Sequence, residues 1–263
     1  KEYEIPFSGG FDVRSITKHL RDCGSSMFAI GQEIDKDSLI NLVMNARDII
    51  GDNSALTAGS LNLGDDTVGK VGILDLGAKQ SIVNVLKKLN FQTVAISPKE
   101  SAENILSMNL KGILISNGPG DPRSLEGVID TVQKLIGNIP IFGICLGHQI
   151  LSLACGLTVK KLEFGHHGSN HPVEIKGIKK ALITAQNHGF AVDDFESDLV
   201  HKEFGRIESY ASNLNDGSNE GISIWESMAY SVQFHPESGP GTSDGLQIFD
   251  PFVKLMESNY AKK

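Results

Sequence analysis

The stretch 139–156, IPIFGICLGHQILSLACG, decides how this chain folds. Its first six residues, 139–144, are mostly apolar and predict a buried strand. The next part, Leu146–Ala154, has the apolar spacing of a short helix that ends at Gly156. Cys145 stands at the junction, where a strand that turns directly into a helix strains the backbone. The stretch therefore predicts a strand–turn–helix unit with a cysteine at its turn.

Cys145 has Gly143 two residues before it and Gly147 two residues after it. This is the spacing of a nucleophile elbow, with sulfur in place of a serine oxygen, and glycine avoids collisions at such a turn. Backbone N–H groups at a helix N-terminus also favour a thiolate. The alternative is a buried structural cysteine. Because His148 and Gln149 follow directly, we favour the nucleophile.

Short apolar runs alternate with amphipathic helices upstream of this stretch. The expected strands are 71–74, 92–96 and 112–116, and the expected helices are 79–89, 102–108 and 125–136. This alternation predicts an α/β fold with a mostly parallel central sheet flanked by helices. Ligands of such sheets bind beyond the carboxyl ends of the strands. Segments 75–79 and 117–121 follow predicted strands, so we expect them at the same edge as Cys145.

Two parts of the chain differ in pattern, and we expect a boundary between residues 1–66 and residues 67–263. The first part is a short helical segment, with helices at 15–21 and 37–50, and 53–69 has the composition of a linker. Asp37 or Ser38 is the expected cap of the second helix, and Gly51 its expected end. The last third is richer in strands, expected at 157–164, 181–185 and 228–234, before a final helix at 247–260.

Composition excludes several classes of function. The 263 residues carry a formal net charge of -8, which argues against nucleic acid or an anionic membrane as the main partner. No apolar run approaches the ~18 residues of a transmembrane helix. Three cysteines do not make a disulfide framework and suit a reducing cytoplasm.

A thiolate nucleophile needs a base, and His235 in VQFHPES is the best candidate. It ends an apolar strand, and Pro236 favours an extended backbone at the histidine. In an extended segment Glu237 points to the same side as His235, where it can orient the imidazole. The alternative is a surface H-P-E turn, which we disfavour because Cys145 is present.

The loop 116–122, SNGPGDP, follows directly after a predicted strand. Its backbone N–H groups, with that of Leu146, are candidates for an oxyanion hole. The alternative is an ordinary turn, since the same residue types form turns. We favour the oxyanion hole because the loop lies at the predicted edge.

Three histidines, His166, His167 and His171, cluster in FGHHGSNHP. Their spacing matches no common zinc pattern and no cysteine pair accompanies them. We expect a loop near the active site here, and no metal.

The motifs GICLGHQ, SNGPGDP and QFHPE together resemble those of the class I, or triad, glutamine amidotransferases. Within that superfamily, the stretches 164–173 (FGHHGSNHPV), 185–193 (AQNHGFAVD) and 235–244 (HPESGPGTSD) resemble the small, glutamine-hydrolysing subunits of carbamoyl phosphate synthetases. Residues 5–30 resemble the end of the N-terminal domain of those subunits, and the rest of that domain, with a serine of the glutamine pocket, is not in this sequence.

The resemblance implies a role for each matching position. Cys145 would attack the glutamine amide, His235 would transfer protons and Glu237 would orient His235. Glutamine and the oxyanion would be held by Lys79, Gly118, Gly120, Leu146, Gln149, Asn187, Gly189 and Phe190.

The resemblance also implies a partner. Ammonia would pass to a carbamoyl phosphate synthetase large subunit that uses ATP, Mg and bicarbonate, in arginine and pyrimidine biosynthesis, while this chain needs no cofactor. Two alternatives stay open: a triad glutaminase that serves another synthetase, and a regulatory subunit that does not hydrolyse glutamine.

Overall fold

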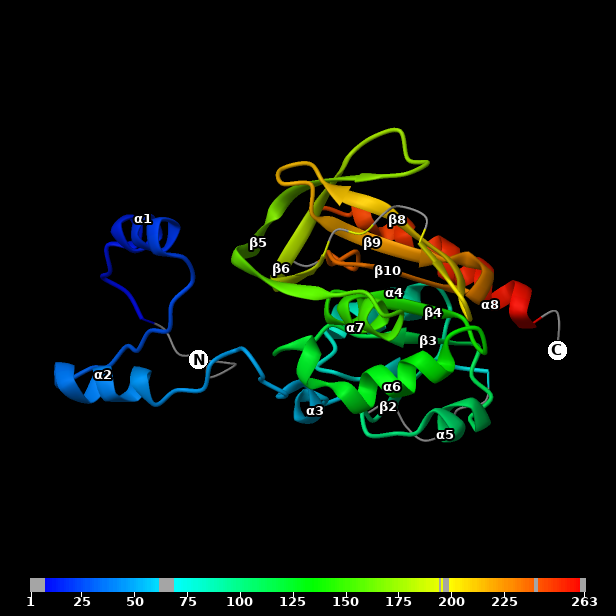
Figure 1. The fold of residues 1–263 in the computed structure, drawn as a ribbon, viewed down its shortest axis with the longest axis horizontal. Helices are drawn as coiled ribbons and strands as arrows, with labels where there is room; N and C mark the ends of the chain where they lie inside the picture. The colour runs from blue at the N-terminus through cyan, green and yellow to red at the C-terminus, as the bar shows by residue number, and fades with distance from the viewer. Residues whose placement is uncertain (1–7, 62–68, 194, 196–198, 239–240, 261–263) are drawn as a thin grey trace. The chain divides into compact units, whose positions relative to one another are not determined.

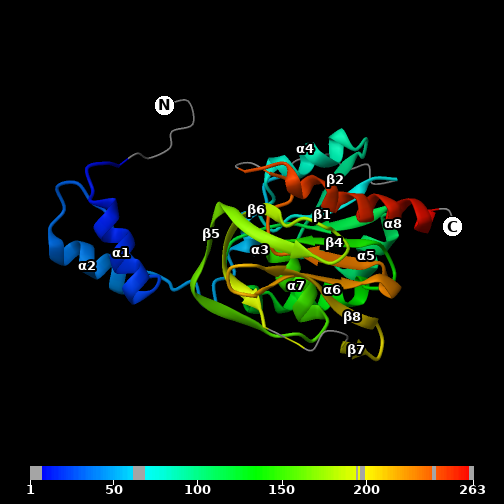
Figure 2. The ribbon, with the colours of Figure 1, turned by 90° about the horizontal axis from the view of Figure 1, so that it is seen from above.

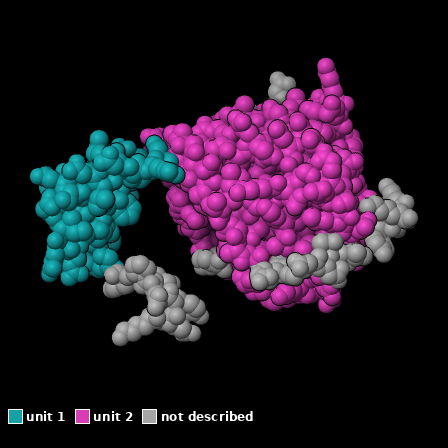
Figure 3. All heavy atoms as spheres, turned by 90° about the horizontal axis from the view of Figure 1, so that it is seen from below, with its two compact units in different colours: residues 1–48 teal, residues 49–263 magenta. Residues whose placement is uncertain are grey.

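The computed structural model describes residues 8–61, 69–193, 195, 199–238 and 241–260. They form two compact units, residues 1–48 and 49–263, which Figure 3 distinguishes by colour. The expected boundary at residues 66 and 67 lies outside the described residues. No helix in the described part of the chain is long and apolar enough to cross a bilayer.

The first unit contains two helices, α1 (Val13–Cys23) and α2 (Lys36–Met44). Asp12 caps α1, as its side chain accepts from the Ser15 N–H. The prediction for the second helix was wrong at both ends. Its cap is Asp35, whose carboxylate accepts from the Ser38 N–H at 2.9 Å, and neither Asp37 nor Ser38 takes that place.

The second helix also stops before the predicted end at residue 50. Asn45 is its C-cap, and both its backbone N–H, at 3.1 Å, and its side-chain amide, at 2.8 Å, donate to the Asn41 carbonyl. Gly51 is therefore not the helix end. The predicted linker 53–69 is also partly wrong, because α3 (Ala55–Ala58) lies in it and Ala55 is fully buried. Residues 62–68 of that linker lie outside the described residues.

The second unit is built on one mixed sheet of ten strands (Figures 1 and 2). The strand order is β2-β1-β3-β4-β10-β9-β8-β5-β6, and β7 pairs with β8. The strands are β1 (Val71–Leu74), β2 (Thr93–Ile96), β3 (Gly112–Ile115), β4 (Ile141–Ile144), β5 (Val159–Ile175), β6 (Leu182–Val192), β7 (Leu199–His201), β8 (Gly205–Asn213), β9 (Asn219–Ile224) and β10 (Ala229–Val232).

The part of the sheet from β2 to β10 is parallel, and this confirms the expected α/β fold. From β10 onward the pairing is antiparallel, through β9, β8, β5 and β6. The predicted strands 71–74 and 139–144 and the helix Leu146–Ala154 are confirmed within three residues. The strands β7, β8 and β9 were not predicted.

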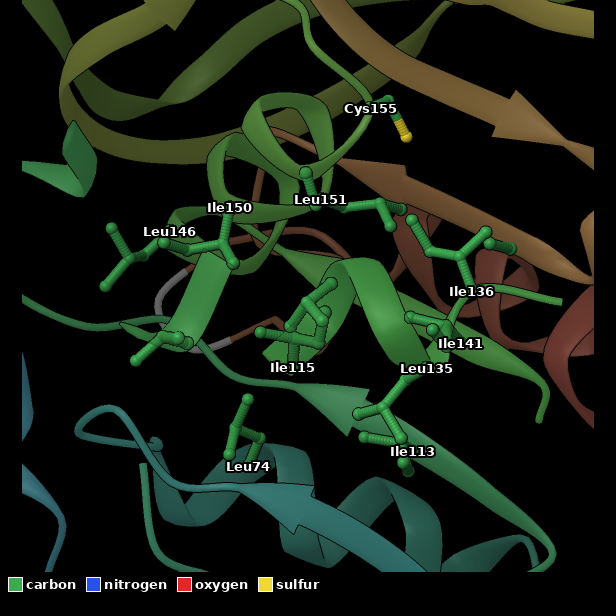
Figure 4. Close-up of a cluster of buried hydrophobic side chains, with 14 of the residues drawn as sticks. Leu74, Ile113, Ile115, Leu135, Ile136, Ile141, Leu146, Ile150, Leu151 and Cys155 are labelled. Atoms are coloured by element: carbon green, nitrogen blue, oxygen red, sulfur yellow. The ribbon is translucent and has the colours of Figure 1, made fainter. Parts of the chain in front are cut away.

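Helices cover both faces of the parallel strands. They are α4 (Gln80–Lys88), α5 (Ala102–Ser107), α6 (Glu126–Leu135), α7 (Leu146–Ala154) and α8 (Asp250–Tyr260), with three short 3-10 helices at Pro122–Ser124, Trp225–Ser227 and Asp244–Phe249. Figure 4 shows the core between α6, α7 and the sheet. A second core on the opposite face contains Leu86 of α4, and in it Phe252 of α8 packs against Phe142 of β4 with ring centroids 5.8 Å apart. Side chains alternate between the cores, as in Ile113 and Leu114 of β3.

The stretch 164–172 is part of a strand and not the loop we expected. It lies inside β5 and pairs with β6, with register shifts between Lys161 and His166 and between Gly168 and His171. Glycine, proline and histidine are typical of loops, but the hydrogen bonds to β6 override that local preference. The long β5–β6 ribbon brings residues 166–171 beside residues 184–188.

Candidate active site

Cys145 lies on the turn between β4 and α7, in a conformation that few side chains adopt. Its φ is 56° and its ψ is -103°, and its N–H donates to the Val232 carbonyl at 2.9 Å. A Cβ on Gly143 would lie 2.6 Å from the Gly147 carbonyl oxygen, and one on Gly147 would overlap the backbone of Ile115. Both glycines are therefore required by close backbone approach, as expected for a nucleophile elbow.

His235 and Glu237 lie where the segment after β10 reaches the carboxyl edge of the sheet. The His235 Nδ1 is 2.8 Å from the Glu237 Oε1, and the His235 N–H donates to the Ala185 carbonyl of β6 at 2.9 Å. Glu237 is 4% exposed, so its carboxylate is held away from solvent. The Lys79 Nζ lies 2.9 Å from the same Oε1, which gives the buried carboxylate a second cation.

The charged groups around His235 and Glu237 shift the pKa values of both residues. Burial lowers the pKa of His235, but the charges and hydrogen bonds of Cys145 and Glu237 outweigh burial and raise that pKa to about 10. Burial raises the pKa of Glu237, but the bonds and charges of His235 and Lys79 lower it overall. The arrangement therefore favours a protonated His235 between the Cys145 sulfur and the Glu237 carboxylate.

The SNGPGDP loop follows β3 and is tied to the loop after β1. The Ser116 hydroxyl accepts from the Leu76 N–H at 2.9 Å, and the Asn117 side chain accepts from the Lys79 N–H at 3.0 Å. A Cβ on Gly118 would overlap the Leu76 carbonyl, so only glycine fits there. These bonds hold the loop next to Leu146, the first residue of α7, whose N–H has no partner within the helix.

The other end of this loop is clamped by residues of the segment 49–54. Asp121 donates its N–H to the Asp52 carbonyl at 2.8 Å, and its carboxylate accepts from the Gly51 N–H at 3.0 Å. Arg123 forms an ion pair with Asp121 at 2.8 Å. A Cβ on Gly120, whose φ is +90°, would lie 2.5 Å from the Asp52 carbonyl oxygen. The loop backbone is thus fixed at both ends.

A cavity of about 300 Å³ opens at Cys145. Seven of the eight residues that the sequence predicted to hold glutamine and the oxyanion line it: Gly118, Gly120, Leu146, Gln149, Asn187, Gly189 and Phe190. The eighth, Lys79, lines a neighbouring cavity of about 620 Å³ together with His235. The structure therefore places Lys79 beside the His235–Glu237 pair.

The β5–β6 ribbon forms the far wall of the cavity. The His167 Nδ1 of β5 lies 2.8 Å from the Asn187 Oδ1 of β6, and both residues line the cavity. The Asn187 carbonyl lies 4.0 Å from the Cys145 sulfur. This pairing of β5 and β6 aligns the stretch GHHG with the stretch QNHG.

The opposite face of the ribbon carries a buried polar network. The Gln186 Oε1 lies 2.9 Å from the His166 Nδ1 and 2.7 Å from the His188 Nε2, and the Gln186 Nε2 donates to the Glu220 Oε1 at 2.7 Å. Glu220 and Asp216 raise the pKa of His166 to about 9 against its burial, whereas burial lowers that of His188 to about 3.

Among the described residues, His166, His188 and Glu220 form a group that could converge on a metal ion, with ligand atoms within 4.8 Å of one another. The His166 Nδ1, the His188 Nε2 and the Glu220 Oε1 each contact Gln186, whereas the Glu220 Oε2 is buried without a hydrogen-bond partner in the described part of the chain. His167 is not part of this group, and its Nδ1 lies against the Asn187 Oδ1 instead.

Gln233 is a site residue that the sequence reasoning missed. It is fully buried and directly follows β10, and its Nε2 lies 3.8 Å from the Cys145 sulfur. A signal for it exists, because Gln233 is two residues before His235 and alternation in an extended segment puts both on one side. Ile49 and Asp52 also line the cavity, and no motif indicates them.

Comparisons with known proteins agree with this geometry. Residues 72–255 match the family model "Glutamine amidotransferase class-I". A carbamoyl phosphate synthase small chain of Staphylococcus haemolyticus is 40% identical over 261 residues, which cover 97% of this chain and 69% of that protein. One of Clostridium acetobutylicum is 43% identical over 249 residues, which cover 94% of this chain and 69% of that protein.

Solved structures show the same fold. A GMP synthase subunit from Thermoplasma acidophilum superposes with a TM-score of 0.62 at 22% identity, over 74% of this chain and 96% of that chain. A glutamine amidotransferase of Thermotoga maritima superposes with a TM-score of 0.51 at 16% identity, over 75% of this chain and 86% of that chain.

Proposed function

We propose that this chain, which belongs to the class I glutamine amidotransferases and among them to the carbamoyl phosphate synthase small chains, hydrolyses glutamine to glutamate and ammonia. The observation that carries the proposal is that Cys145 and His235 line one cavity of about 620 Å³, while the Glu237 Oε1 lies 2.8 Å from the His235 Nδ1. A nucleophile, a proton-transfer group and its orienting acid are the groups that amide hydrolysis requires.

In the first half of the reaction, the Cys145 thiolate attacks the side-chain carbonyl carbon of glutamine. The oxyanion that forms lies against the backbone N–H groups of the 116–122 loop and of Leu146. The His235 imidazolium then gives its proton to the amide nitrogen, the C–N bond breaks, and ammonia leaves a γ-glutamyl thioester. The raised pKa of His235 supports this order, because the proton is present when the attack begins.

In the second half, neutral His235 takes a proton from water, which attacks the thioester carbon. The C–S bond then breaks, glutamate leaves, and the thiolate and the imidazolium are restored. Glu237 orients the imidazole and stabilises its charge throughout. No step in this cycle uses a cofactor on this chain.

We further propose that the ammonia passes to a carbamoyl phosphate synthase large subunit. That subunit would bind ATP, Mg and bicarbonate. The family of the chain supports this partner, and the names of the relatives mention the small chain of that synthase. Free Cys23, Cys145 and Cys155 are consistent with the reducing cytoplasm as the location.

The experiment that tests the proposal is glutamate release from glutamine by this chain, alone and with a carbamoyl phosphate synthase large subunit. We expect release that the partner stimulates, and a loss of roughly 10³-fold or more in Cys145→Ser with an unchanged far-UV spectrum. Release without stimulation would favour a glutaminase of another synthetase. No release, together with no labelling of Cys145 by an electrophilic glutamine analogue, would overturn the proposal and support a regulatory subunit.

A further inference from the structure

The side chain of Gln233 ends in a primary amide that is buried from solvent at the carboxyl edge of the sheet. It directly follows β10, two residues before His235, and its side chain is fully buried. A buried amide has a donor end and an acceptor end, and both need partners to offset the loss of water. The partners of Gln233 are therefore informative about its role.

Those partners link the nucleophile to the wall of the cavity. The Gln233 Nε2 donates to the Cys145 sulfur at 3.8 Å, and the Gln233 Oε1 accepts from the Gln149 Nε2 at 3.0 Å. The same Gln149 Nε2 donates to the Phe190 carbonyl at 2.8 Å. A chain of hydrogen bonds thus runs from the Phe190 carbonyl through two amides to the sulfur of Cys145.

We propose that Gln233 is a positioning residue that supports the Cys145 thiolate and, through the same amide, orients Gln149 so that its carbonyl oxygen faces the substrate. This inference rests on the proposed glutaminase function. It adds to that function a residue that acts on the nucleophile and on substrate recognition together.

The direction of the hydrogen bonds carries the argument. A thiolate and a backbone carbonyl only accept, so both ends of the chain are acceptors. Gln233 must turn its N–H group toward the thiolate, and its oxygen then takes an N–H from Gln149. Gln149 donates its other N–H to Phe190. Its oxygen is the polar atom that remains for a ligand in the cavity that Gln149 lines.

The reverse orientation of Gln233 is unfavourable at both of its ends. Its oxygen would face the negative sulfur, and its N–H group would face the N–H group of Gln149. An acceptor oxygen on Gln149 suits the α-ammonium group of glutamine, which only donates. The ionised nucleophile therefore selects the amide orientation that recognises a cationic amino group. Gln233 thus links the ionisation of Cys145 to the orientation of the Gln149 side chain.

The test uses the full chain and two variants of similar length. Gln233→Met removes both hydrogen-bonding ends, and Gln233→Glu replaces the donor with a carboxylate. The first measurement is the rate of Cys145 alkylation by iodoacetamide against pH, without glutamine. The second is kcat and KM for glutamine hydrolysis.

We expect Gln233→Met to move the midpoint of the alkylation profile up by about half to one pH unit, since one charge-assisted hydrogen bond to the thiolate is lost. Gln233→Glu moves it further, because a carboxylate beside the sulfur opposes ionisation. KM for glutamine rises about tenfold in Gln233→Met, because Gln149 loses the acceptor that fixes its orientation, and it rises less in Gln233→Glu, whose carboxylate still accepts from Gln149. The order of the alkylation midpoints, with Gln233→Glu shifted further than Gln233→Met, is specific to a role at the thiolate.

Ser223→Ala is the matched control. Ser223 is fully buried on β9, directly opposite Tyr230 of β10, and its hydroxyl has no partner among the described residues. We expect a wild-type alkylation profile and a wild-type KM for it.

An unchanged alkylation profile and an unchanged KM in both Gln233 variants would overturn the proposal, and a lowered Tm alone would then show a structural role. If wild-type chain releases no glutamate, the proposed function fails. The alkylation profile, which needs no glutamine, still decides whether Gln233 acts on Cys145.

Discussion

Lys79 and Glu237 form a 2.9 Å ion pair on the same carboxylate oxygen that lies 2.8 Å from His235 Nδ1. Lys79 precedes the first residue of α4, and Glu237 lies after β10, so the pair joins two loops at the carboxyl edge of the sheet. The lysine side chain is 33% exposed and the carboxylate is fully buried. The Glu237 carboxylate is thus held by the His235 imidazole and by the positive charge of Lys79.

Lys79→Met should lower kcat for glutamine hydrolysis about fivefold and leave KM nearly unchanged. A partly exposed ion pair contributes ~1 kcal/mol, and its loss affects the orientation of Glu237 and not the cavity wall. Lys87→Met, at an exposed lysine within α4, is the control. A rise in KM without a change in kcat would instead assign Lys79 to glutamine binding.

His235→Asn should lower glutamate release by roughly 10³-fold or more, because no other group transfers the proton. Glu237→Gln should lose less, because this acid orients the imidazole and does not itself transfer a proton. Steady-state rates of glutamate release on both variants test this. Equal losses would contradict the division of roles.

The stability of the second unit should depend on pH through His166. The pKa of this residue is raised to about 9 in the folded chain, and its ordinary value is ~6.5. The folded state therefore keeps a proton that the unfolded state has lost, so this stabilisation is complete below about pH 6.5 and disappears as the pH rises through 9.

His166→Asn should therefore make the free energy of unfolding less dependent on pH between about 6.5 and 9, by up to about 1.4 kcal/mol per pH unit. Urea unfolding at a series of pH values measures this slope. His201→Asn, on β7 and outside the polar network, should keep the wild-type slope. The same slope in both variants would show that His166 is not charged in the folded chain.

Gly147→Ala should destabilise the chain by roughly 1–3 kcal/mol, because the added methyl group overlaps the backbone of Ile115. It should also lower activity, since the overlap displaces Cys145. A methyl group added at Gly127 of α6 would have no atom within 4 Å, so Gly127→Ala should be neutral or stabilising. Urea unfolding of the two variants gives the comparison, and equal stability would contradict the close approach.

The parallel part of the fold follows from sequence patterns because its strands are continuous apolar runs and its helices have one apolar face. The elbow at Cys145 is equally readable, since glycine spacing is a direct sign of close backbone approach. The antiparallel part is harder. Strand β9 is completely buried and yet contains Asn219 and Glu220, whose Nδ2 and Oε1 atoms bond to side chains on other segments. Periodicity does not show such partners.

The candidate site divides in the same way. The nearness of Glu237 to His235 follows from alternation in an extended segment, which is a local property. The place of Lys79 beside Glu237 depends on two loops 158 positions apart in sequence and needs the fold. Gln233 combines both cases. The sequence alone predicts that it lies on the same side of the extended segment as His235, but its hydrogen-bond partners Gln149 and Cys145 depend on the fold.

The position of β10 between β4 and β9 has a consequence for synthesis of the chain on the ribosome. When residues up to Ala154 have emerged, β4 is the edge of an unfinished sheet, with a row of unpaired backbone groups beside the nucleophile. Its partner β10 begins 85 residues after the end of β4, a delay of several seconds at ~5–20 residues per second. During that interval β4 offers a template for pairing with other nascent chains. Cys145 meets its histidine only after this edge has closed.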